Sequence, residues 1–198
     1  MPKLLLATSN PGKIREYRFL LDALGYQITT LAKEGIVKAV IESGSNYEQN
    51  ARLKALAYAK LSQLTALADD SGLEVDALNG EPGIKSARFA GESASDVDKV
   101  NLLLAKLKNT PWEKRTARFK CVIAIASPRG RVKFCHGECH GMIANEATGG
   151  NGFGYDPIFL FPKMGKTMAE LPFETKNQIS HRARASQKAC RVLQQLPF

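Results

Sequence analysis

The stretch that decides the fold class is "ARFKCVIAIASPRGRVKFCHGECHG", residues 117–141. Two runs rich in β-branched and apolar residues flank the tetrapeptide 127–130, whose Pro and Gly are typical of a tight turn. The pattern therefore predicts a β-hairpin, and the two strands of a hairpin are antiparallel.

Elsewhere in the chain, predicted strands alternate with predicted helices. Strands are expected over 3–8, 26–31, 36–42, 64–70 and 73–78, and helices over 13–24, 45–64, 93–109 and 175–196. Ser45 and Glu48 have the spacing of a capping box at the start of the second helix. Alternating elements that include an antiparallel hairpin favour an α/β fold with a mixed sheet.

The size and composition are those of a soluble globular protein. No linker or repeat divides the 198 residues, so a single domain over 1–198 is expected. The apolar run near the N-terminus is too short for a signal peptide, and no stretch approaches a membrane span. We therefore expect a cytoplasmic protein without a membrane partner.

Charge and cysteine content leave several classes open. The formal net charge of +9 suits a nucleotide, a nucleic acid or an anionic membrane surface as partner. The cluster Cys135, His136, Cys139 and His140 contains possible zinc ligands, but no second paired cluster accompanies it. We interpret these residues as part of the second hairpin strand rather than as a metal site.

Two segments suggest phosphate and metal chemistry. In "ATSNPGK", residues 7–13, a strand, a turn and a helix start with Lys13 make either an anion-binding loop or an ordinary junction. Glu42 and the pair Asp69 and Asp70 are predicted at strand ends, where carboxylates can hold Mg²⁺. Adjacent residues of a strand point to opposite faces, so only one of the two aspartates would face the site.

Three further segments suggest nucleotide binding. Asn50 and Lys54 share a helix face and could donate to phosphate oxygens. In "GGNGFGYDP", residues 149–157, the glycines permit close backbone approach to a ligand, the aromatic rings offer a stacking surface and the aspartate offers an acceptor. The segment "KNQISHRARA", residues 176–185, brings Lys, His and Arg together, either to grip a base edge or as a basic helix face.

Taken together, "ATSNPGK", "ADDSGLEVDALNGEPGIKSARFAG", "GGNGFGYDPIF" and "KNQISHRARA" resemble the dITP/XTP pyrophosphatase family, also called inosine triphosphatases, over nearly the whole chain. The resemblance implies Mg²⁺-dependent hydrolysis of dITP, ITP and XTP to the nucleoside monophosphate and pyrophosphate, which cleanses the nucleotide pool. It also implies an elongated mixed sheet with flanking helices, two lobes around a central cleft, and a homodimer.

The resemblance also implies a set of site residues. Asp70 matches the proton acceptor and a metal ligand, and Glu42 matches a second metal-ligand position. The implied substrate contacts are Thr8, Ser9, Asn10, Pro11, Gly12, Lys13, Ser71, Phe153, Gly154, Tyr155, Asp156, Lys176, His181 and Arg182. One departure is Gln49, which stands where relatives commonly carry Glu and which would weaken the metal site if that Glu binds metal.

Two other functions remain as alternatives. A nucleotide hydrolase that acts on another modified base would share the same site. A non-catalytic basic nucleic-acid-binding protein would leave the strand-end carboxylates unexplained, because acids repel a phosphate backbone. We therefore expect no stable nucleic-acid partner.

Overall fold

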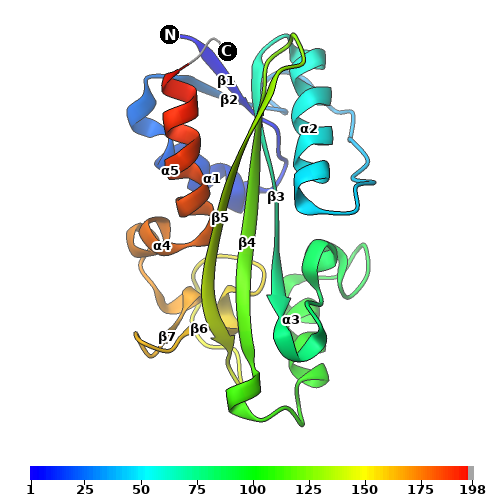
Figure 1. Cartoon of the computed structure of the whole chain (residues 1–198), viewed down its shortest axis with the longest axis vertical. Coiled ribbons are helices and arrows are strands. Elements are labelled where there is room, and N and C mark those ends of the chain that lie inside the picture. The colour runs from blue at the N-terminus through cyan, green and yellow to red at the C-terminus, as the bar shows by residue number, and fades with distance from the viewer. Residues whose placement is uncertain (196–198) are drawn as a thin grey trace. The chain divides into compact units, whose positions relative to one another are not determined.

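The computed structural model describes residues 1–195, and its central element is one mixed β-sheet (Figure 1). Within these residues seven strands follow the order β2-β1-β3-β4-β5-β6-β7. Their bounds are β1 Lys3–Leu6, β2 Gln27–Thr30, β3 Thr65–Val75, β4 Thr116–Ala126, β5 Val132–Ile143, β6 Phe159–Phe161 and β7 Lys166–Thr167. Strand β1 pairs in parallel with β2 and β3, whereas β6 pairs antiparallel with β5 and β7. The predicted α/β class and mixed sheet are confirmed.

The hairpin that decided the class is present as predicted. Strands β4 and β5 are neighbours in the sheet and are joined by the turn at 127–131. The Ser127 amide donates to the Arg131 carbonyl at 2.9 Å, and Gly130 in the turn has φ +89°. Glycine adopts this left-handed conformation without the steric cost that a Cβ would bring.

Five α-helices flank the sheet in residues 1–195: α1 Pro11–Leu20, α2 Tyr47–Ser62, α3 Asp96–Lys106, α4 Phe173–Ile179 and α5 His181–Gln194. The predicted helices over 13–24, 45–64 and 93–109 are confirmed within a few residues. Among the described residues, no helix combines the length and the apolar character that crossing a bilayer requires.

Four predictions of local structure are wrong. Residues 36–42 form no strand, and the strands predicted over 64–70 and 73–78 are one continuous strand, β3, so that Asp69 and Asp70 lie in its middle rather than at a strand end. The final predicted helix is interrupted at Ser180, whose backbone is extended, and its predicted end at Leu196 lies outside the described residues. The N-cap of α2 is Asn46 rather than Ser45, because the Asn46 side chain accepts from the Gln49 amide.

The chain divides into two compact units. Among the described residues, unit 1 contains 1–70, 121–137 and 182–195, and unit 2 contains 71–120 and 138–181. Strands β3, β4 and β5 each contribute residues to both units. The expected lobes around a cleft remain a prediction.

Each unit has its own hydrophobic core. The core of unit 1 includes Leu4, Leu6, Tyr17, Leu67, Cys121, Ile123, Ile125 and Ala189. The core of unit 2 includes Leu73, Val75, Leu103, Phe119, Ile143, Tyr155, Phe159 and Met168. In unit 1, helices α1 and α5 lie together beside the strands and α2 lies on the other side of them (Figure 1). The two faces of β3 are therefore covered by different helices in this unit.

Candidate active site

The junction of β1 and α1 forms a loop with a well-defined helix start. Asn10 is the N-cap, and its Oδ1 accepts from the Lys13 amide at 3.0 Å. Thr8 Oγ1 accepts from the Asn10 amide at 3.2 Å, and Pro11 occupies the first helical position. An Asn cap followed by Pro fixes the first turn of a helix, whose remaining N–H groups are suited to an anion.

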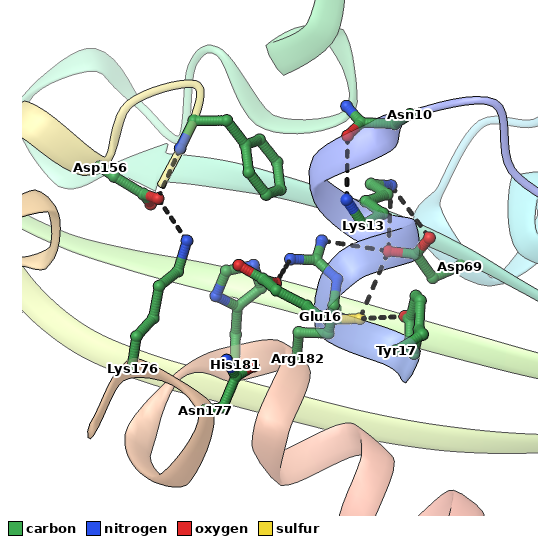
Figure 2. A network of polar contacts seen from close by, with 12 residues as sticks. Asn10, Lys13, Glu16, Tyr17, Asp69, Asp156, Lys176, Asn177, His181 and Arg182 are labelled. Carbon is green, nitrogen blue, oxygen red and sulfur yellow. Dashed lines mark hydrogen bonds and ion pairs between the residues drawn. The ribbon is translucent and has the colours of Figure 1, made fainter. Parts of the chain in front are cut away.

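The Lys13 side chain points from the start of α1 toward strand β3. Its Nζ lies 3.0 Å from both carboxylate oxygens of Asp69 (Figure 2). Arg182 Nη2 lies 3.2 Å from Asp69 Oδ2, and the Asp69 side chain is 0% exposed. The first aspartate of the pair is therefore committed to two cations.

Arg182 is held by a second carboxylate on α1. Its Nη1 lies 2.7 Å from Glu16 Oε2, and both side chains are buried. Its guanidinium also lies 5.7 Å from the centre of the Tyr17 ring, within cation–π range. Arg182, which was expected to contact the edge of a base, thus belongs to a buried network of ion pairs in unit 1.

Asp70 has a different environment on the opposite face of β3. Its Oδ2 accepts from Asn50 Nδ2 on helix α2 at 3.0 Å. The two adjacent aspartates thus contact different helices, as strand geometry predicts.

Electrostatics separates the two aspartates further. Burial alone would raise the pKa of Asp69, but the charges of Lys13 and Arg182 outweigh it and hold that pKa well below its usual range. Burial raises the pKa of Asp70, and the opposing influences of Lys54 and Asn50 do not cancel it. Asp69 is therefore ionised at neutral pH, and Asp70 has the more basic carboxylate.

Glu42 supplies the other carboxylate expected at a metal. It lies in the irregular segment before α2 rather than at a strand end, and its Oε1 is 3.0 Å from Lys54 Nζ. Its charge also raises the pKa of Asp70, so the two carboxylates are close enough to interact.

These donors fit Mg²⁺. That ion typically takes one or two carboxylates and completes its shell with water and substrate phosphates, and Asp70 and Glu42 supply hard oxygen atoms of this kind. Within residues 1–195 no group of three or more His, Cys, Asp or Glu side chains is arranged to hold a metal. The Gln49 side chain accepts from the Ser45 amide and hydroxyl, so it stabilises the start of α2.

Unit 2 contains a second polar cluster built by the glycine-rich loop and α4. Lys176 Nζ forms a short buried ion pair with Asp156 Oδ2, and the same oxygen accepts from the Phe153 amide at 2.9 Å (Figure 2). Lys176 Nζ also lies 4.8 Å from the centre of the Phe153 ring. At Gly152, φ is +79° and a Cβ would come within 2.0 Å of Asp156 Oδ2, so this close approach requires glycine.

The neighbouring Tyr155 has a structural position. Its ring is buried in the unit 2 core, and its hydroxyl donates to the Ser86 carbonyl at 2.9 Å. The Gly154 amide donates to Asp96 Oδ2 at 2.7 Å. The stacking surface expected of Tyr155 is therefore buried in the core, and the partly exposed ring in this loop is that of Phe153.

His181 is fixed by its ring. The ring stacks on Phe119 with centroids 4.6 Å apart and planes at 12°, and Nδ1 lies 4.0 Å from Cys139 Sγ. His181 is 4% exposed, so its orientation is set by packing. Ser71 is half-buried on β3, immediately after Asp70.

The sequence did not indicate three residues of the buried network around Asp69 and Arg182: Glu16, Tyr17 and Cys121. Glu16 follows Lys13 by three residues and shares its helix face, which is the only signal that could have found it. Tyr17 and Cys121 lie beside Asp69, with Cys121 Sγ 3.7 Å from Asp69 Oδ2 and 3.9 Å from the Tyr17 hydroxyl. Their contacts depend on tertiary packing and leave no sequence pattern.

The cysteines and histidines of β5 alternate between its two faces. Cys135 and Cys139 are buried, whereas His136 and His140 are exposed. His136 Nε2 lies 3.4 Å from Glu48, and His140 Nε2 lies 3.1 Å from Glu138. The four side chains therefore do not converge on one point.

Comparison with known proteins gives concordant matches over almost the full length. A model of the Ham1 family matches residues 4–192. A protein named dITP/XTP pyrophosphatase from Desulforamulus reducens is 50% identical over 98% of this chain and 96% of its own, and one from Bacillus subtilis is 44% identical over 98% of both. The solved structure of a HAM1 protein from Coxiella burnetii matches with a TM-score of 0.88 and 40% identity over 98% of both chains. The Ham1 protein of Staphylococcus aureus matches with a TM-score of 0.85 and 46% identity, over 96% of this chain and 97% of that one.

Proposed function

Because the chain belongs to the Ham1 family, we propose that it is a nucleoside-triphosphate pyrophosphatase that hydrolyses dITP, ITP and XTP to the monophosphate and pyrophosphate. The observation that carries this proposal is the division of labour between two adjacent aspartates. Asp69 is neutralised by Lys13 and Arg182, whereas burial raises the pKa of Asp70, which is within electrostatic range of Glu42. A buried carboxylate with a raised pKa is typical of a catalytic base.

In the proposed mechanism, Asp70 accepts the proton of the water that attacks the α-phosphorus. Asn50 orients this carboxylate through the hydrogen bond to Oδ2. Mg²⁺ held by Asp70 and Glu42 would supply positive charge next to the triphosphate. Asp69 holds Lys13 at the mouth of the loop formed by residues 8–13, where its ammonium and the backbone amides stabilise the leaving pyrophosphate.

We assign base recognition to the polar cluster of unit 2. Lys176 and Phe153 provide a cation and a half-buried ring next to one another, and the buried Asp156 fixes both of them. His181 provides a ring nitrogen in a packed, fixed orientation. Donors of this kind pair with the 6-keto oxygen of hypoxanthine or xanthine and not with the 6-amino group of adenine. Such a difference in hydrogen bonding can discriminate by about 10⁴-fold.

Three further properties follow from the family resemblance. We propose a homodimer in the cytoplasm, and we propose that the two units form one functional domain over 1–198. Strands β3, β4 and β5, which are common to both units, support the last proposal. Sedimentation velocity at several concentrations tests the dimer, and a purely monomeric protein would contradict it.

The experiment that tests the proposed function is product analysis with dITP, XTP, dATP and dGTP, each with and without Mg²⁺. The proposal predicts pyrophosphate and monophosphate from dITP and XTP, only with metal. Failure to turn over dITP and XTP, with turnover of another modified nucleotide added to the panel, would favour the related hydrolase. Salt-sensitive binding to DNA or RNA without turnover of any triphosphate would favour the nucleic-acid-binding alternative.

A further inference from the structure

The segment before α2 is tied to that helix on both sides of Glu42. The Tyr58 hydroxyl donates to the Lys38 carbonyl at 3.1 Å and accepts from the Val40 amide at 3.3 Å. On the other side, the Gly44 amide donates to Asn50 Oδ1 at 2.8 Å. Although residues 36–44 form no regular structure, Glu42 is therefore held at a fixed place beside α2.

At that place Glu42 meets Lys54. The Nζ–Oε1 distance is 3.0 Å, and the side chains are 12% and 32% exposed for Lys54 and Glu42. Lys54 is also the largest of the charges that favour ionised Asp70, and it favours ionised Asp69 as well. Its ammonium is thus a cation close to the carboxylates to which the proposed function assigns the metal, and it affects Asp70 more strongly than Lys13 does.

We propose that the Lys54 ammonium is an internal competitor of the divalent cation: it pairs with Glu42 in the metal-free protein and opposes the binding of the ion to that carboxylate. This inference rests on the assignment of Glu42 and Asp70 as metal ligands. The ammonium lies 3.0 Å from Oε1 of Glu42, so a Mg²⁺ ion bound at about 2.1 Å either displaces it or lies beside it, where the two cations repel. Lys54 therefore lowers the affinity for metal in the absence of nucleotide.

The Lys54 ammonium also has an electrostatic effect on the metal-free protein. Two buried or half-buried carboxylates near one another repel, and Lys54 relieves that repulsion while the metal is absent. The same ammonium weakens metal binding until the negative charge of the triphosphate is also present. Tight binding of the ion is in this way made dependent on the triphosphate.

The test measures Mn²⁺ binding to the full chain without nucleotide, by the electron paramagnetic resonance signal of the free ion. Lys54→Met keeps the aliphatic stem and removes the charge. We expect it to bind Mn²⁺ about threefold more tightly, equivalent to about 0.7 kcal/mol, because a partly exposed ion pair is worth about that much. Lys54→Arg retains the cation and should bind as the wild type does.

Two controls separate competition from a general charge effect. Lys60→Met removes the same charge from an exposed position of the same helix and should change the affinity by less than about 1.5-fold. In a Glu42→Gln background, Lys54→Met should lose most of its effect, because the contested oxygen is no longer charged. Thermal melts of every variant establish that it is folded.

The proposal is overturned if Lys54→Met binds Mn²⁺ no more tightly than the wild type, or if it gains equally in the Glu42→Gln background. It is also overturned if neither the wild type nor Lys54→Met binds the ion. Since these measurements contain no nucleotide, their failure is distinct from the failure of the proposed function, which concerns turnover.

Discussion

Of the two substitutions Asp69→Asn and Asp70→Asn, only the first should lower the free energy of unfolding. Asp69→Asn removes a carboxylate that is 0% exposed and lies 3.0 Å from Lys13 and 3.2 Å from Arg182. Removing one partner of a buried ion pair costs about 3–5 kcal/mol. Since Arg182 keeps its contact with Glu16, we expect the lower end of this range, about 3 kcal/mol.

Asp70→Asn should leave the free energy of unfolding unchanged or raise it. Burial raises the pKa of Asp70, so its ionised form is less stable in the folded protein than in the unfolded chain. Above that pKa, an asparagine removes the buried charge and can still accept from Asn50. The same substitution removes the proposed base and should lower kcat by about 10²–10⁴-fold.

Urea unfolding at pH 7, followed by far-UV circular dichroism, measures both effects. Neither substitution alters the backbone, so the signal reports the loss of the same helices and strands in both variants. The pKa of Asp69 is depressed in the folded protein, so its stabilisation is present above the unfolded pKa of about 4 and is lost as pH falls below it. The gap between Asp69→Asn and the wild type should therefore shrink at pH 3.5. Equal destabilisation by both substitutions, or none by Asp69→Asn, would refute the division of labour.

Three further outcomes are expected. The raised pKa of Asp70 in the metal-free protein predicts that Mn²⁺ affinity falls with decreasing pH from a higher pH than an ordinary aspartate would give, because a protonated carboxyl does not hold the ion, and an affinity unchanged down to pH 4 would contradict it. Gly152→Ala should raise KM for dITP at least tenfold, because its Cβ would lie 2.0 Å from Asp156 Oδ2, whereas Gly150→Ala, with open space at its Cβ, should not. Gly44→Ala should weaken Mn²⁺ binding in a calorimetric titration, because its Cβ would lie 2.7 Å from Asn50 Oδ1, which accepts from the Gly44 amide and so holds the segment that carries Glu42; unchanged affinity would show that Glu42 is placed otherwise.

Local patterns predicted much of the sheet and most of the helices. The hairpin over 117–141 was predicted from its turn and its apolar strands, both of which are determined by neighbouring residues. Residues 36–42 were predicted as a strand and are rich in β-branched apolar residues, but Val37 and Ile41 are exposed in the structure. Their conformation is set by the contacts of Tyr58 and Asn50 with the segment, which are tertiary interactions without a local signature.

The site shows the same contrast between local patterns, which the sequence reveals, and tertiary contacts, which it does not. The tandem aspartates indicated two roles, because strand geometry sends neighbouring side chains to opposite faces. The motifs also indicated Lys13, Lys176 and His181, but not what each contacts. The pairing of Arg182 with Glu16 joins residues 166 positions apart, and the pairing of Glu42 with Lys54 depends on how an irregular segment lies. Pairings of this kind can be identified only from the folded structure.

The position of bond cleavage tests the central claim most directly. Hydrolysis of dITP in water enriched in oxygen-18, with Mg²⁺ present, places the label on whichever phosphorus the water attacks. If Asp70 delivers water to the α-phosphorus, the label appears in deoxyinosine monophosphate and the pyrophosphate is unlabelled. Label in pyrophosphate, or release of labelled orthophosphate, would show attack at the β- or γ-phosphorus and would contradict the account.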